Sequence, residues 1–265
     1  MITPRRLLTL LPPPEAWDNG KVERYVSSAL TILSLLGNGF LNVPEVVPLS
    51  RVPNRPLPFR SKIDLLEFGK LLKSKGISLY LNRYFPLVPK GRTRSWLKEA
   101  KGVADGVVVV GKITSRYRYP GYTVEEAVRL ATEYFRHVGV ITIFEREGEV
   151  NRVCRKVKAG ANFLVSQITF YPERVRQFST AVDRRCKELN LPTPRLYVSL
   201  SPVFGTEDVE LLRWMEVDVP RRIPPMGTLV RAMLEIPGVF GINYEHLRYS
   251  NLERLGEVLA GLDTV

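Results

Sequence analysis

Three carboxylates stand just after apolar runs that read as buried strands: Glu45, Glu145 and Glu245. A carboxylic acid that is partly buried can hold its proton near neutral pH, and it can then deliver that proton as a general acid. We therefore expect one of the three to be a catalytic acid. Their positions alone leave open which one it is.

Other polar side chains end the same runs. An amide presents two donors and an acceptor in one plane, which suits the edge of a heterocycle. We expect a substrate to be bound by Asn42, Asn82, Gln167 and Ser201. We expect a cofactor to be bound by Arg83, Arg116 and His246. Any one of these residues can also be polar because a strand end meets water, but their shared position favours a common site.

The elements that must position these residues are eight short runs rich in Val, Ile and Leu, separated by amphipathic segments. The runs mostly do not alternate with polar residues, as expected of strands covered on both faces. They span residues 7–11, 39–43, 77–81, 106–110, 140–144, 163–167, 196–200 and 239–243. Eight strand–helix units predict an α/β protein, a (β/α)8 TIM barrel forming one domain over residues 1–265. The alternative is an open doubly wound sheet, but the runs include no obvious pair of edge strands.

Helix signals lie between the runs. Thr123 and Glu126 have the spacing of a capping box before an apolar stripe that extends to residue 138. Pro172 suits the first turn of another helix. Cys154 and Cys186 fall on apolar stripes, and we expect reduced, buried thiols. With two histidines far apart in the chain and no CxxC pair, we expect no metal site.

The chain carries 39 Lys and Arg against 27 Asp and Glu, a formal net charge of +12, which favours an anionic partner. The cations are spread over most helices rather than gathered in one stripe, which argues against a nucleic-acid binder. No stretch approaches the ~18 apolar residues of a membrane span, and we expect a cytoplasmic protein. A homo-oligomer and a subunit of a larger complex are both compatible with the sequence.

One long segment resembles a known family. "RKVKAGANFLVSQITFYPERVRQF", residues 155–178, is similar to the methylenetetrahydrofolate reductase segment RK-V-[DE]-A-G-A-x-F-x-x-[ST]-Q-x-x-F. In that family the Gln of the motif contacts the pterin ring, and here it is Gln167. Weaker similarities are "LLTLLPPP" to the first strand of the family, "GVVVVGK" to its L-R-G-D, and "SLSPVFGTED" to its G-I-x-P-V.

The resemblance implies a TIM barrel and an oxidoreductase of one-carbon metabolism. Its reaction would reduce a methylene-tetrahydropterin, of the folate or the methanopterin type, to the methyl form with NADH or NADPH, by way of FAD. The chain departs from the family at Thr9, where the catalytic Glu stands, and at Val110 and Lys112, in place of the Arg and Asp near the flavin. Lys112 would then stabilise a reduced flavin or hold a nicotinamide phosphate.

Two alternatives follow from these departures. The barrel would bind a pterin as a methyltransferase or as a non-redox subunit of a one-carbon complex. As a third interpretation, its basic surface would bind RNA.

Overall fold

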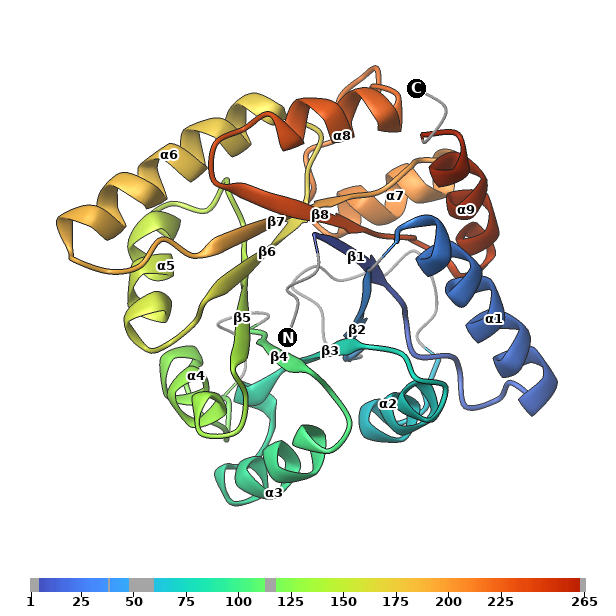
Figure 1. The fold of residues 1–265 in the computed structure, drawn as a ribbon, viewed down its shortest axis with the longest axis horizontal. Coiled ribbons are helices and arrows are strands. Elements are labelled where there is room, and N and C mark those ends of the chain that lie inside the picture. The colour runs from blue at the N-terminus through green and yellow to red at the C-terminus, as the bar shows by residue number, and fades with distance from the viewer. Residues whose placement is uncertain (1–4, 38, 48–59, 113–117, 263–265) are drawn as a thin grey trace.

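The computed structural model describes residues 5–37, 39–47, 60–112 and 118–262. Eight parallel strands pair in chain order and the last pairs with the first, so the sheet is a closed barrel (Figure 1). The predicted (β/α)8 fold is therefore confirmed. The strands are β1 (Arg6–Thr9), β2 (Phe40–Pro44), β3 (Leu79–Arg83), β4 (Gly106–Val109), β5 (His137–Thr142), β6 (Phe163–Ile168), β7 (Arg195–Leu200) and β8 (Val239–Tyr244).

Helices surround the barrel, as Figure 1 shows. They are α1 (Asn19–Leu35), α2 (Leu65–Ser74), α3 (Lys90–Lys101), α4 (Val124–Thr132), α5 (Glu149–Lys158), α6 (Pro172–Glu188), α7 (Thr206–Trp214), α8 (Met226–Leu234) and α9 (Leu252–Ala260), with short 3-10 turns at Phe85–Leu87 and Tyr249–Asn251. Two predicted helix starts are confirmed. Thr123 and Glu126 form the capping box of α4, and Pro172 occupies the first turn of α6.

Two predicted strands are displaced: β3 runs over residues 79–83 rather than 77–81, and a larger error lies where α4 gives way to β5. The apolar stripe that was expected to continue to residue 138 ends with α4 at Thr132, and β5 runs over residues 137–142 rather than 140–144. Val138 suits a helix stripe and a buried strand equally well. The structure pairs it with Val107 of β4, which places it in the sheet.

Aromatic rings fill the barrel interior near the amino ends of the strands. Tyr80, Phe163 and Tyr197 are at most 2% exposed, and the ring centroids of neighbouring pairs lie 5.0 and 5.8 Å apart. Space for these rings requires a glycine on β5, because a Cβ on Gly139 would lie 2.3 Å from the Phe163 ring. The open part of the barrel therefore lies at the carboxyl ends.

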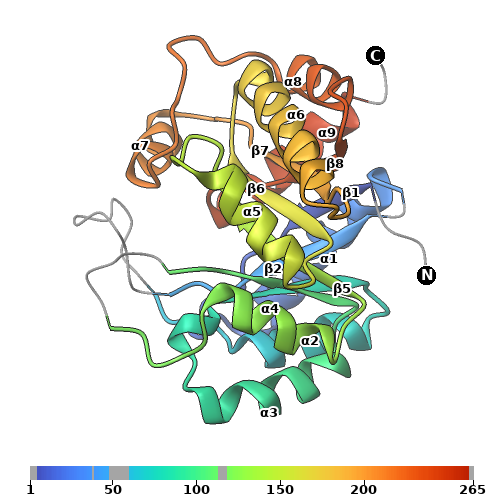
Figure 2. The same ribbon diagram turned by 90° about the vertical axis from the view of Figure 1, so that its left-hand side faces the viewer.

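A second apolar core lies between the strands and the helices, and it includes both cysteines. Helices α5 and α6 lie side by side in Figure 2, and they bring the Sγ atoms of Cys154 and Cys186 to 3.9 Å. Both thiols are free and buried, as predicted. Among the described residues, no helix combines the length and apolar character that a membrane crossing requires.

Candidate active site

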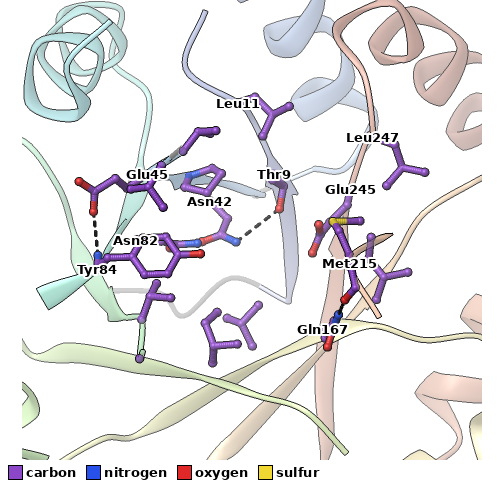
Figure 3. Close-up of a pocket in the computed structure, with 18 of the residues that line it drawn as sticks. Thr9, Leu11, Asn42, Glu45, Asn82, Tyr84, Gln167, Met215, Glu245 and Leu247 are labelled. Atoms are coloured by element: carbon purple, nitrogen blue, oxygen red, sulfur yellow. Dashed lines mark hydrogen bonds between the residues drawn. The ribbon is translucent and has the colours of Figure 1, made fainter. Parts of the chain in front are cut away.

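A cavity of about 1110 Å³ opens at the carboxyl ends of the strands (Figure 3). This is the end at which TIM-barrel enzymes carry their chemistry, and the volume exceeds the usual range for one drug-sized ligand. The residues predicted from strand ends that line it are Asn42, Glu45, Asn82, Lys112, Gln167, Glu245 and His246. The fold therefore brings together, at one cavity, predicted side chains from distant parts of the chain.

Among the described residues, three predicted site residues do not line this cavity, and a fourth prediction falls outside the described residues. Arg83 faces a smaller pocket of about 430 Å³ beside α3. Ser201 is buried, with its hydroxyl donating to the Pro202 carbonyl at 3.1 Å. Glu145 is exposed and pairs with Arg174 at 3.3 Å, because β5 ends three residues earlier than this carboxylate. Arg116 lies outside the described residues.

Glu45 is a carboxylate at the cavity that is tied to a cation. One of its oxygens lies 2.7 Å from Nη1 of Arg83, and the other accepts the backbone N–H of Tyr84 at 2.8 Å. Burial raises the pKa of Glu45, while Arg83 and the Tyr84 N–H lower it. With both oxygens engaged, Glu45 is suited to holding the loop after β3.

Glu245 differs because its hydrogen-bond partners are neutral. Nδ2 of Asn243 donates to Oε1 of Glu245 at 2.9 Å, and the Ser199 hydroxyl forms a second hydrogen bond with the carboxyl group. Within the described part of the chain, no cationic side chain forms an ion pair with Glu245. Burial raises the pKa of Glu245 to about 7, against the smaller lowering effects of Ser199 and Asn243. Of the three predicted acids, this one can carry a proton at neutral pH and faces the cavity.

The hydrogen bonds at Glu245 continue across the barrel. The Thr9 hydroxyl donates to Oδ1 of Asn243 at 3.0 Å and accepts from Nδ2 of Asn42 at 3.4 Å. Figure 3 shows Thr9 with Asn42 on one side and Glu245 on the other. A second Nδ2 hydrogen of Asn243 reaches Oγ of Ser199 at 2.9 Å. Strands β1, β2, β7 and β8 are thus joined by one polar network.

Two amides at the cavity wall have unused acceptors. Within the described residues, Oδ1 of Asn42 and Oδ1 of Asn82 have no hydrogen-bond partner, although the side chains are buried. A buried acceptor without a partner costs free energy, about 1–3 kcal/mol. Donors on a ligand, such as the N–H groups of a heterocycle, would relieve that cost after a small side-chain rotation.

Gln167 lies where the pairing of β6 is irregular. The register between β6 and β7 shifts between Val165 and Ile168, and such irregularities turn side chains toward functional sites. Nε2 of Gln167 donates to the backbone carbonyl of Met215 at 2.6 Å, which fixes the amide against the segment after α7 (Figure 3). The carbonyl oxygen and the second N–H hydrogen of the amide are the groups available for reading a ligand.

His246 lines the cavity as a neutral ring. Its Nδ1 lies 3.0 Å from the carbonyl oxygen of Arg248, and its Nε2 lies 3.2 Å from the hydroxyl of Tyr25. Burial lowers the pKa of His246 to about 4. At neutral pH His246 is therefore uncharged and contributes the surface of its ring to the cavity. A residue that binds the phosphate of a cofactor would instead be expected to carry a positive charge.

A basic wall lines the cavity, and apart from Lys112 it was not predicted from the sequence. This wall consists of Lys112 after β4 together with Arg146, Arg152, Arg155 and Lys156. The spacing of the last three, i, i+3 and i+4, places them on one side of a helix and is the signal that could have identified them. Among the described residues, nine cationic side chains line the cavity against four carboxylates. The excess favours an anionic ligand.

A single buried carboxylate supports much of this wall. Oε1 of Glu149 lies 3.3 Å from Nζ of Lys156, and Oε2 lies 3.9 Å from Arg146 and 3.8 Å from Arg152. Burial lowers the pKa of Lys156, and Glu149 opposes that effect. Three cations thus share one negative charge, which leaves the wall positive.

The described residues contain no group of three His, Cys, Asp or Glu side chains placed to hold a metal ion. Organic anions with polar ring edges fit the donor set better, because the cavity combines amides, a carboxylic acid and cations. The phosphates of a flavin or nicotinamide dinucleotide would also suit the basic wall.

No protein-family model matches the chain, and no curated protein sequence matches it either. Several solved structures, however, are similar to this one. An uncharacterized protein from Clostridium thermocellum that binds two copies of 5-methyl-5,6,7,8-tetrahydrofolic acid has a TM-score of 0.72 at 17% identity, covering 99% of this chain and 96% of that one. A chain of the tryptophan synthase α2β2 complex from Pyrococcus furiosus has a TM-score of 0.56 at 14% identity, covering 98% of each. At these identities the similarity establishes the barrel fold.

Proposed function

We propose that this barrel binds an anionic tetrahydropterin of the folate or methanopterin type and reduces its methylene form to the methyl form. The observation that carries this proposal is Glu245, an enclosed carboxylic acid with neutral hydrogen-bond partners that faces the same cavity as Gln167. A ligand of this class is also supported by the Clostridium thermocellum barrel, which binds 5-methyltetrahydrofolate. The sequence motif around Gln167 supports the same class.

The charges and amides of the cavity suit such a ligand. A tetrahydropterin has a planar ring edge with alternating donors and acceptors, which Gln167, Asn42 and Asn82 can read. The carboxylates of a folate tail, or the acidic tail of a methanopterin, would meet the cations that line the cavity. Exclusion of water by the aromatic floor of the barrel would strengthen these interactions.

The acid is needed because a methylene bridge between two nitrogens does not open by itself. Protonation of one bridging nitrogen breaks its bond to the methylene carbon, and the carbon becomes an iminium on the other nitrogen. Addition of a hydride to that carbon gives the methyl group, so one proton and one hydride are consumed. Glu245 would supply the proton, and the amide of Asn243 would stabilise the carboxylate that remains.

A nicotinamide cofactor, acting directly or by way of FAD, would supply the hydride. The residues that would hold its phosphates are Lys112, Arg152 and Lys156, since these cations line one side of the cavity. If FAD is retained, the purified protein should be yellow and should bleach anaerobically with NADH or NADPH. A colourless protein that does not take up added FAD would exclude the flavin route.

The central test is oxidation of NADH or NADPH that depends on a methylene-tetrahydropterin. Glu245→Gln should abolish turnover while it retains pterin binding, because the amide keeps the shape of the acid but has no transferable proton. Full turnover in this variant would contradict the assignment of the acid.

The second candidate function is binding of a pterin without reduction. Thr9, Val110 and Lys112 favour it, because the family has a catalytic Glu and two flavin-contacting residues at these positions. In that case the protein would bind the methyl form and oxidise neither NADH nor NADPH in the presence of any methylene-pterin.

A further inference from the structure

The amide of Asn243 lies at the centre of the polar network, and both its nitrogen and its oxygen form hydrogen bonds. Asn243 is 0% exposed. Its Nδ2 group donates to Ser199 and to Glu245, both at 2.9 Å, and its Oδ1 accepts from Thr9 at 3.0 Å. A rotation of the amide by 180° would exchange the oxygen and the nitrogen, so its partners decide which atom faces Glu245.

Ser199 holds the nitrogen side of the amide, since its Oγ accepts from Nδ2 of Asn243 and its hydroxyl bonds to the Glu245 carboxyl group. Thr9 holds the oxygen side, because its hydroxyl accepts from Nδ2 of Asn42 and directs its single hydrogen to Oδ1 of Asn243. Donation therefore runs in one direction, from Asn42 through Thr9 and Asn243 to the Glu245 carboxylate.

We propose that Thr9 is a positioning residue for the reaction, because its hydrogen bond to Asn243 keeps the amide N–H directed at Glu245. The inference rests on the proposed role of Glu245 as the proton donor. The inference assigns a function to the residue at which this chain departs from the reductase motif. Thr9 does not supply the acid but supports one that directly follows the neighbouring strand β8.

The hydrogen bond from Asn243 affects how readily Glu245 releases its proton. A hydrogen bond donated to the carboxylate favours the charged form and opposes the effect of burial. Removal of the Thr9 hydroxyl would leave Oδ1 of Asn243 without its donor and loosen the amide, so the N–H directed at Glu245 would be lost for part of the time. Glu245 would then hold its proton more tightly and deliver it less readily.

The test is a ¹³C NMR titration of protein labelled at the glutamate side-chain carboxyl carbon, with Glu245→Gln used to assign the Glu245 signal. In Thr9→Val the midpoint of the Glu245 titration should rise by about one pH unit, the equivalent of part of one hydrogen bond to a charged group. Thr9→Ser, which keeps the hydroxyl, should restore the wild-type midpoint. Thr93→Val is the matched control, since Thr93 is also buried and does not line the cavity.

A wild-type midpoint in folded Thr9→Val would overturn the proposal, as would a raised midpoint that Thr9→Ser fails to restore. If Thr9→Val does not fold, Thr9→Ala provides the same comparison without the added methyl group. The titration needs neither substrate nor turnover. It can therefore fail while Glu245→Gln still abolishes activity, and it can succeed where the reductase assay fails.

Discussion

Nη1 of Arg83 lies 2.7 Å from the carboxylate of Glu45, and both side chains are less than one-fifth exposed. This ion pair distinguishes Glu45 from Glu245, which the sequence alone could not do. Burial raises the pKa of both carboxylates. Among the described residues, the Arg83 cation opposes that effect at Glu45, whereas the partners of Glu245 are a neutral amide and a hydroxyl, so Glu245 is the better proton donor.

Glu45→Gln should therefore act on stability. The substitution leaves Arg83 partly buried without its carboxylate, and we expect the free energy of unfolding to fall by about 1–3 kcal/mol. Urea denaturation measures this change. Among folded molecules, the pH at which turnover falls should stay at its wild-type value. A displaced pH midpoint with unchanged stability would instead make Glu45 the acid.

Stability should depend on pH through Glu245. Its pKa is about 7 in the folded protein against an ordinary value of 4.5, so between these values the folded state binds a proton that the unfolded state lacks. The contribution of Glu245 to stability is thus most favourable below pH 4.5 and is lost as the pH rises through 7.

The amount lost is about 3 kcal/mol, and Glu245→Gln should remove this dependence. The difference in unfolding free energy between wild type and Glu245→Gln, measured from pH 5 to pH 8, isolates it from other titrating groups such as His246. A constant difference would contradict the raised pKa of Glu245.

Gln167→Leu should weaken pterin binding by about 1–3 kcal/mol, because polar groups on the ligand edge would lose their partner. Isothermal titration with the pterin measures the change. Gln177→Leu is the control, since Gln177 is exposed on α6 and bonds to Glu173. Equal affinities in wild type and Gln167→Leu would place Gln167 outside the binding site.

The basic wall should contribute affinity that salt can screen. Arg152→Gln should weaken binding of an anionic pterin or of a nicotinamide dinucleotide by about 1–2 kcal/mol at low ionic strength, and by less at high salt. Arg184→Gln, at an exposed position on α6 away from the cavity, should leave the affinity unchanged. A loss of affinity that is the same at all salt concentrations would indicate a packing role for Arg152.

The barrel could be predicted from the sequence because its strands are covered on both faces. Mainly apolar runs such as 163–167 and 196–200 are typical of such strands, and the structure puts β6 and β7 there. The error at β5 arose where the apolar pattern fits either type of element. Glu145 was misplaced with it: β5 ends at Thr142, and Glu145 is exposed and pairs with Arg174, although its neighbour Arg146 lines the cavity.

Much of the site could not be read from the chain. Thr9 and Asn243 are 234 positions apart in sequence, and only closure of the barrel brings β1 against β8 and makes their hydrogen bond visible. The ion pair that distinguishes Glu45 from Glu245 also depends on side-chain direction. Strand-end position identifies candidates for a site, whereas the partners that set their chemistry come from tertiary structure.

The most direct test of the account is titration of the protein with 5-methyltetrahydrofolate and with its methanopterin counterpart, followed by tryptophan fluorescence. Trp17 and Trp214 line the cavity, so a ligand bound there should change the emission. We expect saturable binding of one of these pterins, weakened in Gln167→Leu and retained in Gln177→Leu. Failure of both pterins to bind, confirmed by calorimetry, would contradict it.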